Sequence, residues 1–323
     1  MKRIALLTSG GDAPGMNAAI RAVVRAGIDA GMQVYGVRRG YEGLIEDDIM
    51  EMGRNDVGGI LYRGGTILKS ARSERFLHGE WVDVAVENLR RRGIDSVVVI
   101  GGDGSFHGGL ELAKRGISVA GIPGTIDNDL GYTEYTIGFD TALNTVVELI
   151  NKIRDTSTSH ERTTIMEVMG RHCGDIALYS GLACGADIIL VPEVEMDTEE
   201  LVRRVREHQA MGKGHIIIVK AEGVDMPILE TQQLLEAVTG QETRSVVPGY
   251  IQRGGSPSVQ DRLIADLTCG MAIDLLAHPE KRPSDSFAVG VSGSTPFAVD
   301  LKDAVEQKRV FRRDIYDLAT VLA

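Results

Sequence analysis

The sequence predicts an α/β protein with two domains, each a mostly parallel sheet flanked by helices, and with a site in the cleft between them. Short apolar runs alternate with amphipathic stretches from the first residues onward. Glycine-rich turns follow several of these runs, and a chain of 323 residues is long enough for two cores. Such βαβ alternation places strands in parallel, with their carboxyl ends along one edge of a sheet.

The elements follow from the period of the apolar residues. Strands are expected at 4–7, 34–37, 97–100, 119–122, 163–169, 187–191, 216–220, 246–252 and 287–291. Helices are expected at 16–31, 85–92, 106–115, 142–154, 199–214 and 303–323. A boundary between the domains is expected near Gly138.

Composition narrows the class of protein. The chain is 43% hydrophobic and 25% charged, as in soluble globular proteins, and its net charge of −11 argues against a nucleic-acid partner. The 3 cysteines have no metal-ligand spacing and are expected to be reduced. The N-terminal apolar run is too short for a signal peptide and no later run would span a membrane, so a cytoplasmic protein with no membrane partner is expected.

Three glycine motifs follow predicted strands: TSGGDAPG (8–15), GGDGS (101–105) and PGTIDND (123–129). Glycine lets backbone N–H groups approach an anion, and the next helix N-terminus adds partial positive charge. A tight turn without a ligand explains any single motif equally well. The first turn lacks both the Gly-Lys-Ser/Thr of a Walker A loop and GxGxxG, which argues against an NAD-dependent oxidoreductase.

Carboxylates in the second and third motifs indicate a cation. Asp103, Asp127 and Asp129 would repel an anion unless a divalent cation lies between, and Mg²⁺ prefers one or two carboxylates together with phosphate oxygens. The alternative for Asp103 is that it caps a helix beginning near Phe106.

Arginines near strand ends supply positive charge that the chain as a whole lacks. Guanidinium binds phosphate in a bidentate manner, so several such residues suit a phosphoryl-transfer site with a metal and one carboxylate base. These arginines are Arg72, Arg162, Arg171, Arg244 and Arg253.

Five motifs in this order closely resemble the bacterial ATP-dependent 6-phosphofructokinases: TSGGDAPGMNAAIR, IGGDGS, PGTIDND, EVMGRHCGD and IQRGGSP. The resemblance covers almost the whole chain. It implies transfer of the ATP γ-phosphoryl group to the 1-hydroxyl of fructose 6-phosphate, with Mg²⁺, in a cytoplasmic homotetramer of glycolysis. It also implies two discontinuous domains: 1–138 plus 251–301 for ATP, and 139–250 plus 302–323 for the sugar phosphate.

The resemblance assigns roles to individual residues. Asp127 is the general base, assisted by Arg72, Arg171 and Thr125, and Asp103 with Asp129 holds Mg²⁺. The ATP site comprises Gly11, Tyr41, Arg72, Ser73, Gly102, Asp103, Gly104, Ser105 and Gly108, with Phe76 and His107 nearby. The sugar-phosphate site comprises Thr125, Asp127, Met169, Gly170, Arg171, Glu222, Tyr250 and Arg253, with Arg162 and Arg244 reaching in from a neighbouring subunit. Glu222 has an alternative interpretation as an ion-pair partner of Lys220.

Gly104 and Gly124 favour ATP as donor, because pyrophosphate-dependent relatives carry an acidic residue and a lysine at these positions. Tyr250 replaces the usual histidine, which predicts a modest change in sugar-phosphate affinity. A pyrophosphate-dependent enzyme and a non-catalytic nucleotide sensor of the same fold remain the alternatives.

A second site of the family, for ADP or phosphoenolpyruvate between subunits, is only partly matched. The matching positions are Arg21, Arg25, Arg54, Arg154, Gly185, Asp187 and Lys213, although the family has Glu where Asp187 stands. Gly59 replaces an aspartate, and Met211 and Gly214 replace basic residues. A solvated helix face would explain Arg21 and Arg25 as well. Weak effector binding and blunted regulation are therefore expected.

Overall fold

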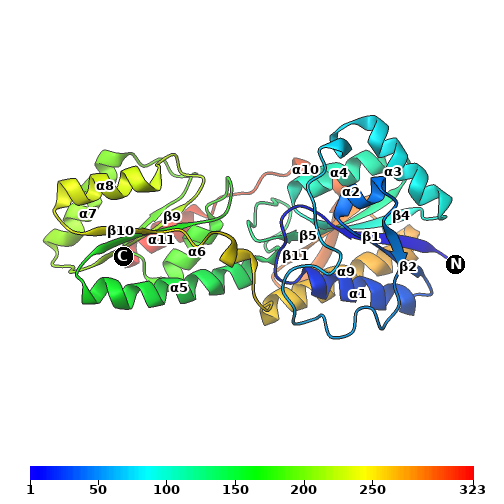
Figure 1. Ribbon diagram of the computed structural model, residues 1–323, viewed down its shortest axis with the longest axis horizontal. Helices are drawn as coiled ribbons and strands as arrows, with labels where there is room; N and C mark the ends of the chain where they lie inside the picture. The colour runs from blue at the N-terminus through cyan, green and yellow to red at the C-terminus, as the bar shows by residue number, and fades with distance from the viewer. The chain divides into compact units, whose positions relative to one another are not determined.

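The computed structural model describes residues 1–323. The chain divides into two compact units (Figure 1). Unit 1 contains Met1–Thr141 and Arg253–Arg309, and unit 2 contains Ala142–Gln252 and Val310–Ala323. Each unit has a mostly parallel sheet flanked by helices, which confirms the predicted fold class.

Unit 1 is built on an 8-stranded sheet of order β12-β11-β5-β4-β1-β2-β3, with β6 paired to β5. Its strands are β1 (Arg3–Thr8), β2 (Gln33–Val37), β3 (Ile49–Glu51), β4 (Ser96–Gly101), β5 (Ser118–Thr125), β6 (Ile137–Gly138), β11 (Phe287–Ser292) and β12 (Thr295–Asp300). Only β3 and β12 run antiparallel to their neighbours. The central strands are buried on both faces, which explains why β4 reads as an unbroken apolar run.

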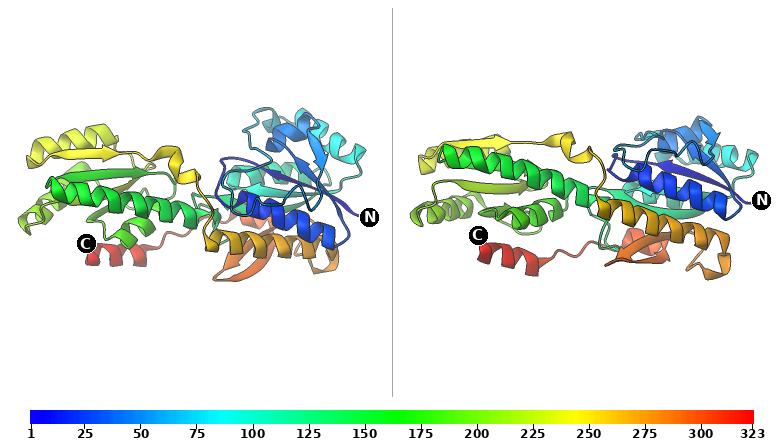
Figure 2. Two further views of the ribbon diagram at one scale, coloured as in Figure 1. Left: turned by 60° about the horizontal axis from the view of Figure 1, so that its bottom comes forward. Right: turned by 90° about the horizontal axis from the view of Figure 1, so that it is seen from below.

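Helices cover both faces of this sheet (Figures 1 and 2). α1 and α9 pack side by side on one face, while α2, α3, α4 and α10 bury apolar side chains against the other. The bounds are α1 (Met16–Asp29), α2 (Gly40–Ile45), α3 (Gly79–Arg91), α4 (Asp103–Ala113), α9 (Val259–Ala277) and α10 (Leu301–Glu306), with 3-10 turns at Arg75–Leu77 and Pro279–Lys281.

Unit 2 has a 4-stranded, fully parallel sheet of order β10-β7-β9-β8. α7 and α8 bury leucine and valine side chains against one face, α5 and α6 lie on the other, and α11 packs on α6. The bounds are β7 (Thr163–Val168), β8 (Ile188–Leu190), β9 (Ile216–Ala221), β10 (Thr243–Val246), α5 (Phe139–Ser159), α6 (Asp175–Cys184), α7 (Thr198–Ala210), α8 (Ile228–Thr239) and α11 (Arg313–Leu322).

Two predicted elements are wrong in ways that matter for the site. The strand expected at 246–252 ends at Val246, and a 3-10 turn over Gly249–Arg253 follows, because Pro248 lacks an N–H and Gly249 has φ 56°. The single helix expected at 303–323 is two helices, α10 in unit 1 and α11 in unit 2, joined by residues 307–312.

Candidate active site

The three glycine motifs of unit 1 meet at one edge of its sheet. Thr8 is in register with Ile100, and Gly101 with Pro123, so β1, β4 and β5 end side by side. The turns that follow them are therefore neighbours, as expected for a doubly wound sheet. This brings together the segments that carry Gly11, Asp103 and Asp127.

The second turn requires glycine for space. A Cβ at Gly101 would lie 2.4 Å from Ser105 Oγ and 2.8 Å from Ser9 O, so no larger residue fits. The first turn approaches closely as well: a Cβ at Gly11 would lie 3.0 Å from the Arg253 guanidinium. A predicted ATP residue and a predicted sugar-phosphate residue are thus adjacent within unit 1.

Asp103 does not cap a later helix. α4 begins at Asp103 itself, three residues before the predicted start at Phe106, with Gly102 as its N-cap and no side-chain capping bond. The capping interpretation of Asp103 is therefore wrong. Its carboxylate is 45% exposed and lies 3.6 Å from His107 Nε2, which leaves it accessible at a helix N-terminus.

Asp127 occupies a buried position just beyond β5. The residue is 6% exposed, and its backbone N–H donates to Thr125 Oγ1 at 3.2 Å. Asn128, at φ 53°, turns the chain, and its side chain accepts a bond from the Thr136 N–H at 3.1 Å. Local polar contacts thus fix the TIDND turn, with Asp129 half-buried at its far end.

The aromatic residues predicted around the nucleotide contribute to packing. The rings of Tyr41 and Phe76 stack with centroids 4.2 Å apart, and both side chains are buried. The Tyr41 hydroxyl donates to Ser105 O, and burial raises its pKa. A Cβ at Gly108 would lie 2.6 Å from the Tyr41 ring, so Gly108 gives that ring its space. Arg72, four residues before Phe76, is exposed.

In unit 2, Glu222 holds the turn after β7. Its Oε1 accepts the backbone N–H groups of Gly170 at 3.1 Å and Arg171 at 2.8 Å. Gly170 has φ 139° and Arg171 φ 55°, so this backbone needs such support. Lys220 pairs with Glu167 at 2.8 Å, and no Lys220–Glu222 pair forms.

A cavity of about 180 Å³ joins several predicted sugar-phosphate residues of unit 2. Met169, Glu222 and Tyr250 line it together. Gln252, which is fully buried, accepts the Met169 N–H at 3.1 Å and donates to Gly249 O at 3.1 Å. Sequence reasoning missed this amide, since nothing in GYIQRGG distinguishes it from a surface glutamine.

Arg162 and Arg244 lie together at the other end of the same sheet. Both approach Glu242 Oε1, Arg162 at 3.8 Å and Arg244 at 2.6 Å. Arg162 precedes β7, whereas Met169 to Arg171 follow it. The 6 residues of β7 span roughly 20 Å. One copy of the chain therefore does not bring this pair to the turn held by Glu222.

The predicted effector residues of unit 2 are already engaged. Lys213 Nζ lies 2.5 Å from Asp187 Oδ1, and Asp187 Oδ2 accepts the Ile217 N–H at 2.7 Å. Arg154 donates to the carbonyls of Cys184 at 2.5 Å and Gly185 at 3.0 Å, at the end of α6.

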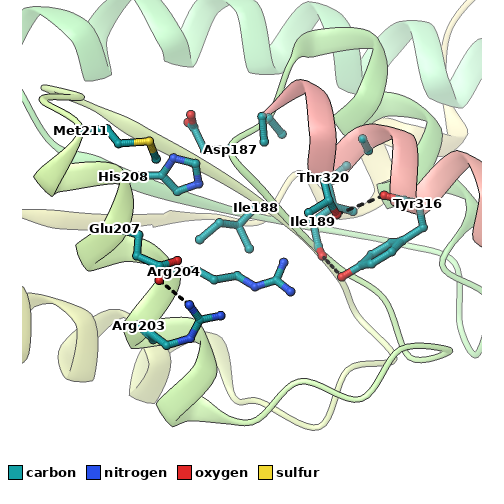
Figure 3. Close-up of a pocket in the computed structure, with 13 residues that line it drawn as sticks. Asp187, Ile188, Ile189, Arg203, Arg204, Glu207, His208, Met211, Tyr316 and Thr320 are labelled. Carbon is teal, nitrogen blue, oxygen red and sulfur yellow. Dashed lines mark hydrogen bonds and ion pairs between the residues drawn. The ribbon is translucent and has the colours of Figure 1, made fainter.

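Asp187 also borders a cavity of about 290 Å³ between β8, α7 and α11, together with Met211 and His208 (Figure 3). Burial, and then the Lys213 charge, lower the pKa of His208.

The other three predicted effector residues are in unit 1. Arg21 and Arg25 are half-buried on α1, and Arg54 pairs with Asp29 at 3.2 Å on an exposed surface. Arg25 Nε is buried without a hydrogen-bond partner.

No group of three or more His, Cys, Asp or Glu side chains is arranged to hold a metal ion. None of the helices combines the length and the apolar character that crossing a membrane requires.

Comparison with known proteins decides the family. Residues 3–276 match the family described as phosphofructokinase. This chain belongs to the phosphofructokinase family. The ATP-dependent 6-phosphofructokinase of Clostridium botulinum (strain Hall) is 50% identical and that of Clostridioides difficile (strain 630) 52% identical, each over 323 residues and the whole of both chains. The resemblance predicted from the five motifs is confirmed.

Solved phosphofructokinases share the fold. Phosphofructokinase from Saccharomyces cerevisiae is 35% identical with a TM-score of 0.87, and this chain spans 47% of that longer chain. Pichia pastoris phosphofructokinase in the T-state is 35% identical with a TM-score of 0.90, over 38% of its chain. A pyrophosphate-dependent phosphofructokinase from Marinobacter aquaeolei, 22% identical with a TM-score of 0.84 over 97% of this chain and 86% of its own, shows the fold alone.

Proposed function

We propose that this phosphofructokinase transfers the γ-phosphoryl group of ATP to the 1-hydroxyl of fructose 6-phosphate, giving fructose 1,6-bisphosphate and ADP in glycolysis. The observation that carries the proposal is the meeting of Gly102, Asp103, Thr125 and Asp127 at one sheet edge: a Cβ at Gly102 would lie 3.4 Å from the Thr125 side chain. The names of the relatives that match over the whole of both chains support the same reaction.

Asp127 is the proposed general base. Phosphoryl transfer needs a carboxylate that takes the proton of the acceptor hydroxyl and cations that balance charge on the moving group. Thr125 fixes the backbone beside Asp127, as its accepted bond from the Asp127 N–H indicates. Arg72 and Arg171, exposed on their loops, are the proposed cationic clamps.

The donor set of unit 1 fits Mg²⁺ bound with a nucleotide. Asp103 offers an accessible carboxylate at a helix N-terminus, and Asp129 is the second proposed oxygen ligand. One or two carboxylates suffice when phosphate oxygens and water complete the coordination. When bound, the ion would neutralise charge on the phosphates, while the first turn of α4 would offer them backbone N–H groups at Asp103 and Gly104. The Ser105 N–H already donates to Gly102 O at 3.0 Å.

ATP is the proposed donor because position 104 leaves room. A Cβ at Gly104 meets no atom within 4 Å, so no packing constraint requires glycine there. At Gly124, a Cβ would lie 3.0 Å from Ile100 Cγ2, which leaves little room for a lysine. Pyrophosphate-dependent relatives carry an acidic residue and a lysine at positions 104 and 124, and this chain has glycine at both. The open surroundings of Gly104 leave space for the α-phosphate of ATP.

The sugar phosphate is proposed to bind Met169, Gly170, Arg171, Glu222, Tyr250 and Arg253, with Arg162 and Arg244 of a neighbouring copy. The roughly 20 Å length of β7 favours this division, since both arginines lie at its start. A working site then needs at least two copies, and a homotetramer is the proposed assembly.

Regulation by ADP or phosphoenolpyruvate is proposed to be weak. A phosphate group would have to compete with Asp187 for Lys213, and Arg154 is committed to two carbonyls. The two cations absent at positions 211 and 214 would each contribute on the order of 1–3 kcal/mol if partly buried.

The variant Asp127→Asn tests the central proposal. We expect it to lower kcat by about 10²- to 10⁴-fold, the usual contribution of a general base, while calorimetry with Mg·ATP shows nearly unchanged affinity. Retained turnover in Asp127→Asn would remove Asp127 from this role. Turnover of the unsubstituted protein with pyrophosphate and not with ATP would identify pyrophosphate as the phosphoryl donor. Turnover with neither donor would favour a non-catalytic nucleotide sensor of the same fold.

A further inference from the structure

The loop that carries Arg72 and Ser73 has little regular secondary structure. Residues 69–77 contain no strand and no α-helix, only the 3-10 turn Arg75–Leu77. Phe76 is the buried anchor of this loop, stacked on Tyr41 of α2. The position of exposed Arg72 therefore depends on how the residues on either side of it are fixed.

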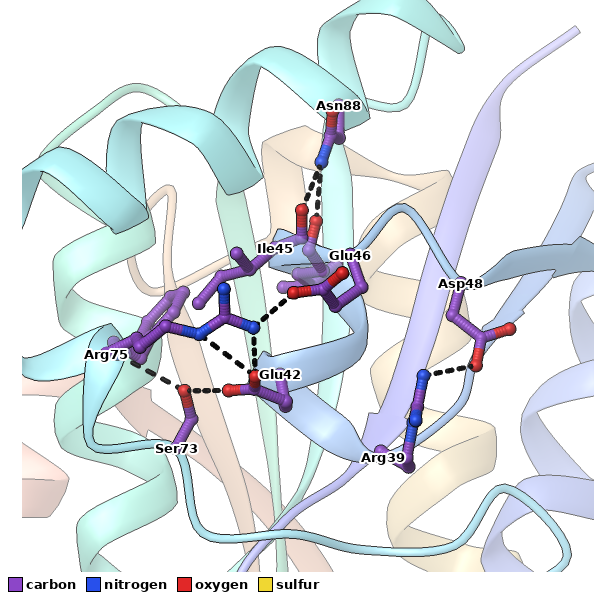
Figure 4. Close-up of polar contacts among 10 residues, drawn as sticks. Arg39, Glu42, Ile45, Glu46, Asp48, Ser73, Arg75 and Asn88 are labelled. Atoms are coloured by element: carbon purple, nitrogen blue, oxygen red, sulfur yellow. Dashed lines mark hydrogen bonds and ion pairs between the residues drawn. The ribbon is translucent and has the colours of Figure 1, made fainter.

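A single carboxylate of α2 binds two side chains of this loop just after Arg72 (Figure 4). Glu42 Oε2 accepts the Ser73 hydroxyl at 2.6 Å, and its Oε1 accepts Arg75 Nε at 3.0 Å. A second Arg75 nitrogen also bonds Glu42, as well as Glu46. The Phe76 N–H donates to Ser73 Oγ at 3.2 Å, which closes the turn on itself.

Arg75 is committed to this network and is not available to a phosphate. Its guanidinium lies between the carboxylates of Glu42 and Glu46 and 4.9 Å from the centroid of the Trp81 ring. Hydrogen bonds from Arg75, and then from Ser73, lower the pKa of Glu42, so the carboxylate stays ionised. Arg72, three positions earlier, is the arginine that remains exposed for a ligand.

The Ser73 hydroxyl is also occupied. A serine has one hydroxyl hydrogen, and here Glu42 accepts it. A phosphate oxygen needs a donor, so the Ser73 hydroxyl cannot serve Glu42 and ATP at once. The Ser73 side chain therefore fixes the loop. The predicted contact between Ser73 and ATP would be made by the backbone N–H of Ser73.

We propose that Glu42 is a positioning residue of the ATP site, which fixes residues 73–76 through Ser73 and Arg75 and thereby places the adjacent Arg72. The adjacent Tyr41 bonds Ser105 O in the glycine turn of α4. α2 thus joins two segments of the site, one through each side chain. This inference rests on the proposed function, because it takes Arg72 to hold ATP.

The test is Glu42→Gln, which keeps the shape and removes the charge. We expect KM for ATP, and the dissociation constant of Mg·ATP by calorimetry without sugar, to rise about 5- to 30-fold, as the loss of one or two kcal/mol predicts. KM for fructose 6-phosphate should stay within about twofold. Ser73→Ala should weaken ATP binding in wild type but add little to Glu42→Gln, since both act through one contact.

Asp48→Asn is the matched control. It removes the ion pair between Asp48 and Arg39, 3.1 Å long, which lies beside the same helix. Asp48 makes no ion pair or hydrogen bond with residues 69–77, so KM for ATP and KM for fructose 6-phosphate should stay unchanged. Amide hydrogen exchange tests the role of Glu42 separately from the proposed reaction. The exchange rate of residues 73–77 should rise in Glu42→Gln whichever reaction the protein catalyses. An unchanged ATP affinity, or an equal loss for both substrates, overturns the role of Glu42. If the wild-type protein binds Mg·ATP but does not turn it over, the proposed function is contradicted and the role of Glu42 in ATP binding is not.

Discussion

At the scale of single residues, the glycines of GGDGS have different reasons to be glycine. Gly101 is required by packing, because a Cβ there would meet Ser105 and Ser9 O at under 3 Å. Gly104 is not, since its surroundings are open and it lies in the first turn of α4. Of these two positions, packing therefore leaves only 104 free to be set by a ligand.

Gly104→Asp separates folding from binding. A carboxylate in the first turn of a helix is favourable and meets no neighbour, so urea unfolding should show undiminished stability. The same carboxylate should repel ATP phosphates and raise KM for ATP by at least about tenfold, or 1.4 kcal/mol. Gly104→Ala, which adds bulk without charge, should have a smaller effect. A normal KM for ATP in the aspartate variant would contradict the assignment.

At the scale of elements, strands and their turns could be predicted from sequence far better than the contacts that stabilise them. Apolar runs ending in glycine located β1, β4 and β5, and hence the meeting of three motifs at one edge. The start of α4 was predicted three residues late, because Gly102 rather than a polar residue is its N-cap. Helix α9 was not predicted because its exposed face also carries apolar side chains, Val259, Leu263 and Leu267, so the amphipathic signal is weak.

Polar residues that act on backbone were beyond sequence reasoning. Asp261 illustrates this, because DRLIADL resembles a solvated helix start. In the structure Asp261 is fully buried and accepts the N–H groups of Gly138 and Thr141, joining α9 to the segment where the chain leaves unit 1. Burial raises the pKa of the Asp261 carboxyl to about 6, although the hydrogen bonds from Gly138 and Thr141 act to lower it. The contacts of Glu42, and the bonds of Glu222 to the backbone, escape detection for the same reason: their partners are distant in sequence.

The pairing of Lys213 with Asp187 is an element-scale constraint on regulation, since it joins the loop after α7 to the start of β8. We expect initial rates against fructose 6-phosphate to be nearly hyperbolic and to change little with phosphoenolpyruvate or ADP. Asp187→Asn should free the Lys213 charge and tighten phosphoenolpyruvate binding by about fivefold, near 1 kcal/mol.

Calorimetry with phosphoenolpyruvate checks this expectation directly. Glu207→Gln is a suitable control, because Glu207 borders the same cavity but bonds Arg203. Tight phosphoenolpyruvate binding by the unsubstituted protein would show that Lys213 exchanges Asp187 for phosphate readily, and would contradict weak regulation.

At the scale of the whole molecule, the sheet of unit 2 separates two sets of the residues proposed to bind the sugar phosphate. The turn with Arg171 follows β7, whereas Arg162 precedes it, and the two sets cannot meet within one copy. If both sets bind one substrate, each site takes them from different copies. Assembly then determines activity directly, and a separated chain should be inactive even when fully folded.

Mixed assemblies test this shared site. Arg162→Ala and Arg171→Ala should each be nearly inactive alone, because every site would lack one of the cations proposed to bind the sugar phosphate. When the two variants are mixed equally and their copies exchange, about a quarter of the sites should take both arginines from intact contributors. Activity should therefore rise toward a quarter of wild type, with no gain before exchange. If both arginines served one site within a single copy, mixing would restore nothing, since every copy carries one defect.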